Sequence, residues 1–119
     1  MENNNKVKPP VLLVDDEIQI LISYNVMLKS AGIKNTFTLE DSRKVLPFLH
    51  ENGASAIKLD LTMPFISGQE LLVKIKEEFP EIPVIVATAT NDITTAIECM
   101  QNGAENYLVK PIEKNHFIS

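Results

Sequence analysis

Cysteine, histidine and tryptophan are scarce in this sequence, which has one, two and none of them in 119 residues. A single cysteine cannot form an internal disulfide, which favours a reducing, cytoplasmic compartment. We interpret Cys99 and Met100 as core filling, and His50 and His116 as isolated surface residues. None has a partner at metal-ligand spacing, so we predict no zinc-type site and no catalytic role for them.

Long apolar runs and basic clusters are also missing. No stretch approaches the roughly 18–20 consecutive apolar residues that span a bilayer, and the first residues do not read as a targeting signal. The net charge is −5, without a block of like charges. This acidity argues against direct binding to the phosphate backbone of nucleic acid. We therefore expect a cytoplasmic domain that contacts neither membrane nor nucleic acid directly.

What is present fits one compact domain. The hydrophobic content of 45% and the charged content of 23% are ordinary for a globular protein of 119 residues. Residues 1–9 are rich in asparagine and end at the first residue of a Pro-Pro pair. They predict a disordered leader, followed by a single domain over residues 10–119.

Short apolar runs alternate with amphipathic segments along the domain. This alternation predicts an α/β fold, with a parallel sheet and right-handed crossovers that place helices on both faces. The predicted strands are Val11–Asp15, Lys34–Leu39, Ala56–Asp60, Ile82–Thr88 and Asn106–Val109. The predicted helices are Glu17–Ala31, Asp41–Asn52, Gly68–Phe79, Ile93–Asn102 and Ile112–Ser119. The last has room for only about two turns before the sequence ends, so we expect it to be truncated.

Helical spacing predicts which sides of the helices are buried. In the first helix, the residues predicted to face the sheet are Ile20, Tyr24, Met27, Leu28 and Ala31. In the fourth, they are Ile93, Ala96, Ile97 and Met100. A second apolar stripe on the first helix, predicted to be exposed, consists of Ile18, Ile22 and Val26. Pro47 predicts a kink in the second helix, or a short helix.

Polar side chains stand where four of the apolar strands end. They are Asp15, Asp16, Asp60, Thr88 and Lys110. Ligands of open parallel sheets lie outside the carboxyl ends of the strands, near the point where strand order reverses. If these strands are neighbours, three carboxylates, a hydroxyl and an ammonium converge there. Such a set can hold a divalent cation and stabilise a phosphoryl group.

Each residue type suits a role in phosphoryl transfer. Mg²⁺ prefers oxygen ligands, which Asp15, Asp16 and Asp60 offer. The carboxylate of Asp60 can also accept a phosphoryl group as a nucleophile, while Thr88 and Lys110 can neutralise the phosphoryl oxygens. Taken singly, each has an ordinary interpretation: a helix-capping doublet, a turn aspartate, a strand threonine and a surface lysine.

Five motifs in order carry a more specific signal. They are Val14-Asp15-Asp16-Glu17, Leu59-Asp60-Leu61-Thr62-Met63-Pro64 followed by Gly68, Thr88-Ala89, Gly103-Ala104 and Tyr107-Leu108-Val109-Lys110-Pro111. Together they resemble the receiver domain of two-component response regulators, over nearly the whole chain from Val11. The segment from Thr88 to Pro111 looks most like receivers of NtrC-like transcription activators.

The resemblance implies a flavodoxin-like (CheY-like) three-layer α/β/α sandwich, with a five-stranded parallel sheet in the order 2-1-3-4-5. It implies that Asp60 accepts a phosphoryl group from a sensor histidine kinase or a phosphotransfer protein. It also implies that Asp15, Asp16, Asp60 and the backbone carbonyl of Thr62 bind Mg²⁺. The domain would be a regulatory switch rather than an enzyme, although it would assist its own phosphorylation and dephosphorylation.

The same resemblance implies a relay. Thr88 moves toward the phosphoryl group, Tyr107 swings inward behind it, and Lys110 pairs with the phosphate. The change passes to an output module in the same full-length chain, which we expect to regulate transcription. A homodimer through the fourth- and fifth-helix face is compatible with the family, and the exposed stripe of the first helix would dock the kinase.

Three alternatives stay open at this point. A haloacid-dehalogenase-like phosphohydrolase would carry a second aspartate at the position of Thr62, and a flavodoxin-like cofactor binder would not have an acidic first loop. A phosphorylation-independent receiver-like interaction domain remains the main alternative. Lys58 departs from the family, which is usually apolar there. We expect its stem to be buried and its ammonium to escape or to be paired.

Overall fold

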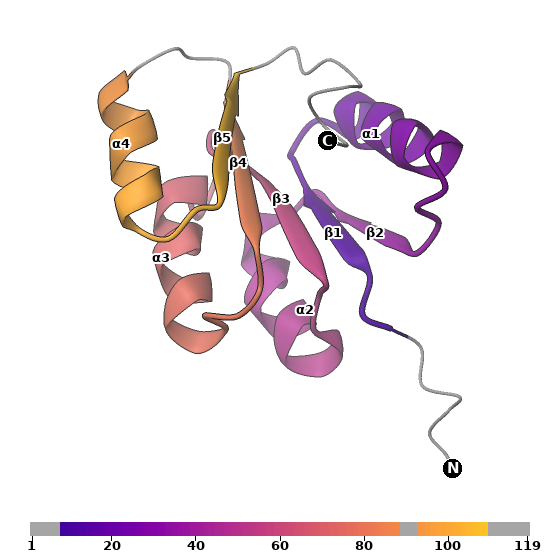
Figure 1. Ribbon diagram of the computed structural model, residues 1–119, viewed down its shortest axis with the longest axis horizontal. Coiled ribbons are helices and arrows are strands. Elements are labelled where there is room, and N and C mark those ends of the chain that lie inside the picture. Colours follow the sequence, from indigo (N-terminus) through magenta and orange to yellow (C-terminus); the bar gives the residue numbers. More distant parts are fainter. Residues whose placement is uncertain (1–7, 89–92, 110–119) are drawn as a thin grey trace.

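The computed structural model describes residues 8–88 and 93–109, which form a five-stranded parallel sheet with helices on both faces (Figure 1). The strands are β1 (Val11–Val14), β2 (Thr36–Leu39), β3 (Ala56–Asp60), β4 (Val84–Thr88) and β5 (Asn106–Val109). Their spatial order is β2-β1-β3-β4-β5, as predicted. The order reverses at β1, so the carboxyl ends of β1 and β3 lie at the crevice where ligands of such sheets bind.

The helices divide unequally between the two faces. One face carries α1 (Ile18–Ser30) alone among the described helices, and the other carries α2 (Val45–Asn52), α3 (Gly68–Glu78) and α4 (Ile93–Gln101) (Figure 1). A 3₁₀ turn, η1 (Ser42–Lys44), precedes α2. The predicted last helix, Ile112–Ser119, and the first seven residues of the predicted leader lie outside the described residues.

Two apolar cores hold these layers together. The larger core joins the sheet to α2, α3 and α4, and its fully buried side chains include Leu59, Leu72 and Ile75. The buried members of the smaller core, beneath α1, are Leu13, Leu21, Tyr24 and Leu28. The predicted inward side of α1 is confirmed for Tyr24 and Leu28. It is wrong for Ala31, which lies past the last turn of α1 and is exposed.

The predicted inward side of α4 is wrong for its three large residues. Ile93, Ile97 and Met100 are 72%, 52% and 46% exposed, so Met100 does not fill the core, whereas Cys99 does, as predicted. Ala96, the fourth residue predicted to face inward, is half-buried. Two apolar stripes at helical spacing compete in this segment, and periodicity alone could not choose between them.

Pro47 is accommodated without breaking a helix. It occupies the third residue of α2, inside the first turn, where backbone N–H groups have no partner within the helix. The helix is correspondingly short, with eight residues, as the proline predicts. The turn before it begins with a cap, because the Asp41 carboxylate accepts a hydrogen bond from the backbone N–H of Arg43 at 2.9 Å.

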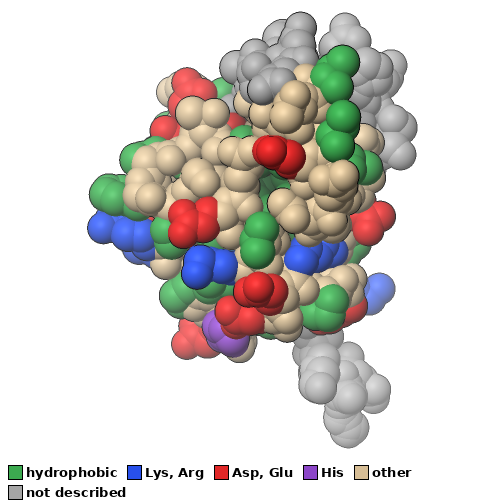
Figure 2. Space-filling model, turned by 90° about the vertical axis from the view of Figure 1, so that its left-hand side faces the viewer, with side chains coloured by type: hydrophobic (Ala, Val, Ile, Leu, Met, Phe, Trp, Pro, Cys, Tyr) green, Lys and Arg blue, Asp and Glu red, His purple; other side chains and the backbone are tan. Residues whose placement is uncertain are grey.

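The surface over α3 and α4 is mixed in character. Figure 2 shows acidic, basic and apolar side chains interspersed on this side of the molecule. Within residues 8–88 and 93–109, none of the helices combines the length and the hydropathy needed to cross a membrane.

Candidate functional site

Three carboxylates converge at the carboxyl ends of β1 and β3. Asp15 and Asp16 directly follow β1, Asp60 ends β3, and the parallel register pairs Val14 with Leu59. One oxygen of each carboxylate lies within 4.8 Å of the others. Asp15 and Asp60 are buried, at 0% and 2% exposure, and Asp16 is exposed. The topology therefore brings together the three acidic residues that the sequence singled out.

Asp15 is buried but well supported. Its Oδ1 accepts a hydrogen bond from the backbone N–H of Glu17 at 3.0 Å, and its Oδ2 lies 3.3 Å from the ammonium of Lys58. Lys58 itself is only 2% exposed, and its Nζ lies 4.0 Å from the ring centroid of Tyr24. The expectation that a lysine in β3 would be paired is confirmed. Its partner is one of the site carboxylates, which the sequence did not reveal.

The loop after Asp60 is held by Ser42, a residue that the sequence offered only as an alternative to Asp41 for the cap of the second helix. The hydroxyl of Ser42 donates to the carbonyl of Pro64 at 2.9 Å and accepts from the N–H of Ile66 at 3.1 Å. Ser42 is 2% exposed and lies 22 residues before Pro64. Nothing in the local sequence marks this contact, because it exists only once η1 packs against the loop.

Replacing Ser42 by alanine is expected to loosen this loop. The change removes a hydroxyl that serves two backbone groups, and leaving buried polar groups unpaired costs about 1–3 kcal/mol. We expect the free energy of unfolding in urea to fall by that amount. Ser30→Ala is the control, because Ser30 is exposed and bonds only locally, to the carbonyl of Met27. Equal stability of the two variants would show that Ser42 does not hold the loop.

An aromatic residue and an arginine flank the same loop on the outside. Phe65 is 68% exposed with a backbone φ of 71°, a conformation that is unusual for a bulky side chain. The guanidinium of Arg43 stacks 3.7 Å from its ring centroid and forms an ion pair with Asp41 at 2.9 Å. The hydrogen bond from the Arg43 side chain holds the pKa of Asp41 below its ordinary value.

Of the remaining predicted site residues, all but one lie within the described part of the chain. Thr88 ends β4 and is 2% exposed, and Tyr107 lies on β5 opposite Val86, half-buried against the larger core. Thr62 is exposed in the loop after Asp60. Lys110 lies outside the described residues. The structure therefore brings Asp15, Asp16 and Asp60 into one cluster, and it places Thr88 at the same edge of the sheet, two strands from β1.

Cys99 and His50 lie apart from this cluster. Burial is the main cause that raises the pKa of the Cys99 thiol, and the neighbouring charge of Glu98 adds to it. His50 is exposed on α2 and contacts Glu78 at 2.6 Å. His50 therefore lies at the surface, as predicted, but it is not isolated, and His116 lies outside the described residues.

Sequence comparison gives a match over almost the whole chain. The family described as "Response regulator receiver domain" matches residues 11–119. The chain is 36% identical over 109 residues to the DNA-binding transcriptional regulator NtrC of Salmonella typhimurium, covering 92% of this chain and 23% of NtrC. It is 34% identical over 108 residues to the C4-dicarboxylate transport transcriptional regulatory protein DctD of Pseudomonas aeruginosa, covering 91% and 23%. The chain therefore spans less than a quarter of these relatives.

Solved structures show the same architecture. A response regulator receiver domain protein from Clostridium thermocellum aligns with a TM-score of 0.84 at 32% identity, over 92% of this chain and 87% of that chain. The signal receiver domain of a putative Luxo repressor protein from Vibrio parahaemolyticus aligns with a TM-score of 0.86 at 32% identity, over 93% and 85%.

Proposed function

This chain belongs to the response regulator receiver domain family, and from that premise we propose that its Asp60 is the phosphorylated residue of a signalling switch. One observation carries the assignment. Asp60 is a nearly buried carboxylate at the end of β3, within a cluster of three carboxylates at the switch point of the sheet. An ordinary turn aspartate would be exposed and would have no acidic neighbours from β1.

The same cluster suits Mg²⁺. Three carboxylate oxygens within 4.8 Å of one another are hard ligands of the kind that this ion prefers, and two of the carboxylates are held inside the protein. We propose that Asp15, Asp16, Asp60 and the backbone carbonyl of Thr62 hold it. When bound, Mg²⁺ would neutralise the negative charge that gathers as a phosphoryl group meets these carboxylates.

The residues of the chain supply the other parts of the reaction. An oxygen of Asp60 forms a bond to phosphorus while the bond from phosphorus to the nitrogen of a phosphohistidine breaks, and the imidazole leaves with the electron pair. Thr88 donates a hydrogen bond to one phosphoryl oxygen, and Lys110 pairs with another. Tyr107 moves inward behind Thr88, which transmits the change along β5.

Intact-mass spectrometry tests the proposal. The chain is incubated with acetyl phosphate, with and without Mg²⁺, and its intact mass is measured. A second sample of the product is reduced with borohydride, which releases the phosphate and converts a phosphorylated aspartate to homoserine. We expect a gain of one phosphoryl group that depends on Mg²⁺, and homoserine at position 60. No adduct at short times and low temperature would contradict the proposal and favour a receiver-like domain that binds proteins without phosphorylation.

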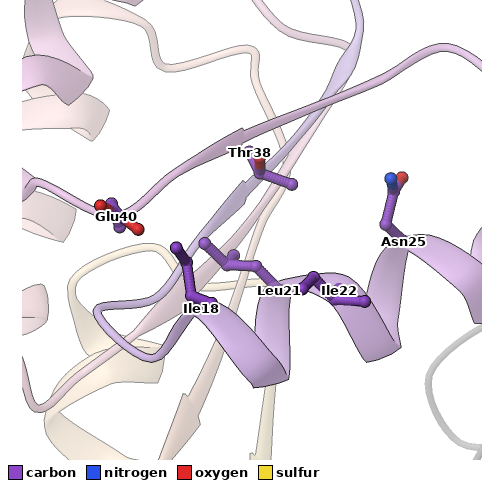
Figure 3. A pocket seen from close by; sticks show the side chains of 6 residues that line it. All are labelled: Ile18, Leu21, Ile22, Asn25, Thr38 and Glu40. Atoms are coloured by element: carbon purple, nitrogen blue, oxygen red, sulfur yellow. The ribbon is translucent and has the colours of Figure 1, made fainter.

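We propose that α1 docks the phosphodonor, a histidine kinase or phosphotransfer protein. Ile18, Ile22 and Val26 are 52%, 54% and 61% exposed along one side of α1. A hollow of about 340 Å³ lies between α1 and the end of β2. Ile18 and Ile22 line it together with Asn25, Thr38 and Glu40 (Figure 3). An apolar helix side with a polar rim suits contact with another helix.

Ile22→Glu is expected to slow phosphotransfer from a kinase without affecting the fold. A charge on this exposed side should change the free energy of unfolding by no more than about 0.5 kcal/mol. With a purified histidine kinase that phosphorylates the unsubstituted chain, we expect transfer to be about tenfold slower or more, the loss expected when a charge enters an apolar contact. Labelling by acetyl phosphate should be unchanged. Equal rates of transfer from the kinase to Ile22→Glu and to the unsubstituted chain would show that this side of α1 does not dock the kinase.

The output of the switch is proposed from the relatives. NtrC and DctD are transcriptional regulators more than four times as long as the matched segment. We propose that the full-length protein carries an output module that regulates transcription in the cytoplasm, and that this domain does not itself contact DNA. Homodimerisation through the face formed by α4 and the predicted fifth helix, which lies outside the described residues, stays a prediction.

A further inference from the structure

Lys58 is a buried cation inside the acidic site. It lies in the middle of β3, between Ile57 and Leu59, and only 2% of it is exposed. A lysine is rarely buried to this extent unless it is paired, because removing an ammonium from water is costly. Its pairing with Asp15 at 3.3 Å meets that requirement. The stem passes along the sheet face beneath α1, where the ring of Tyr24 lies 4.0 Å from the ammonium.

This pairing engages a carboxylate that the metal also needs. Both oxygens of Asp15 already accept hydrogen bonds, from the backbone N–H of Glu17 and from Lys58. Three carboxylates alone would give the site a charge of −3, and the ammonium reduces this to −2. A divalent cation bound by Asp15 and its neighbours would therefore lie close to a positive charge that is fixed inside the protein.

We propose that Lys58 is a resident counter-ion that competes with Mg²⁺ for Asp15 and sets the Mg²⁺ concentration that the switch requires. The inference rests on the proposed function, since it concerns the same metal site. Without Mg²⁺, the ammonium stabilises the clustered carboxylates. With Mg²⁺, the two cations repel each other, and each weakens the hold of the other on Asp15.

Lys58→Met tests the competition, because methionine keeps an unbranched stem of similar length and removes the charge. Titration calorimetry should give a dissociation constant for Mg²⁺ at least about tenfold lower than in the unsubstituted chain, a small part of what Coulomb's law allows at this range. The matched control is Lys29→Met. Lys29 is exposed in the last turn of α1, at the opposite end of the helix from the site. The dissociation constant of Mg²⁺ from the Lys29→Met variant should therefore equal that of the unsubstituted chain.

Stability gives an independent measurement. Removing one partner of a buried pair leaves the other charge uncompensated. The melting temperature of Lys58→Met should therefore fall below that of the unsubstituted chain without Mg²⁺, and should rise more when Mg²⁺ is added. If this variant does not fold, Lys58→Gln keeps a hydrogen-bond donor without the charge and should also bind Mg²⁺ more tightly. In the unsubstituted chain, the NMR signal of the Lys58 side chain should shift most among the lysines on titration with Mg²⁺.

The outcomes separate this inference from the function on which it rests. Mg²⁺-dependent labelling by acetyl phosphate, together with equal or weaker Mg²⁺ binding by Lys58→Met, overturns the role of Lys58 and leaves the switch intact. A Lys58 signal that does not respond to Mg²⁺ also overturns it. If the unsubstituted chain neither binds Mg²⁺ nor becomes labelled, the proposed function fails, and the role of Lys58 fails with it.

Discussion

Asp60→Asn is expected to abolish labelling by acetyl phosphate and by a kinase, with or without Mg²⁺. Asparagine has nearly the same shape as aspartate, but its amide is not a nucleophile for phosphorus. The side chain lies at the end of β3, and its neighbours come from the ordered ends of β1 and β4. We therefore expect the fold to persist and the chemistry to disappear, which intact mass and circular dichroism together would establish.

The stability of this variant carries a second expectation. Asp60 lies within a cluster of carboxylates that repel one another, and a pair of charges at this range near a protein surface interacts by a few kcal/mol. Removing one charge should raise the free energy of unfolding without Mg²⁺ by about 1–3 kcal/mol. Asp41→Asn is the control, because Asp41 pairs with Arg43 on the outside of the molecule and should neither gain stability nor lose labelling. Residual labelling of Asp60→Asn would show that another carboxylate accepts the phosphoryl group.

The placement of the acidic site could be predicted because it follows from strand topology. The apolar runs that end at Asp60 and at Thr88 became β3 and β4, with their last residues as expected. Parallel strands bring their carboxyl ends to one edge. The strand order implied by the resemblance makes β1 and β3 neighbours, so Asp15, Asp16 and Asp60 could be expected to converge. The roles of these residues stay predictions until the labelling experiment is done.

What could not be predicted depends on packing between distant segments. The partner of Lys58 is 43 residues away in sequence, and the loop contact of Ser42 spans 22 residues. The side of α4 that faces the sheet was chosen wrongly, because large apolar residues at Ile93 and Ile97 give a stronger helical pattern than the small residues that pack. Hydrophobic spacing reports that a helix has an apolar side, whereas the fit between surfaces decides which side is buried.

Gly68 begins α3, as predicted, but the packing that requires a glycine there could not be predicted from the sequence. It follows the cap formed by Ser67 and is buried. A Cβ at this position would lie 2.2 Å from the carbonyl oxygen of Asp60 and 2.5 Å from the Cα of Leu61. Both atoms belong to the backbone, so neither can move aside as a flexible side chain would. The absence of a side chain is what lets α3 begin directly against the end of β3.

Gly68→Ala is therefore expected to be severely destabilising. The backbone of α3 or of the loop after Asp60 must shift, and overpacking of this kind costs about 3 kcal/mol or more. Because the clash is with the backbone of Asp60 itself, labelling by acetyl phosphate should also slow in whatever fraction remains folded. Urea denaturation and the initial rate of the mass increase measure the two effects.

Gly32→Ala is the matched control for this substitution. Gly32 has a φ of +93°, and a Cβ there would meet no atom within 4 Å. The Gly32→Ala variant therefore has backbone strain without a steric clash, which should lower its free energy of unfolding by about 1–2 kcal/mol. Gly32 follows α1, at the end of the sheet away from Asp60, so its labelling rate should match that of the unsubstituted chain. Suppose that both alanine variants unfolded at the same urea concentration and were labelled at the same rate. The inference that α3 packs too closely against the end of β3 to admit a side chain at position 68 would then be wrong. The proposed link between the start of α3 and the position of Asp60 would then be lost.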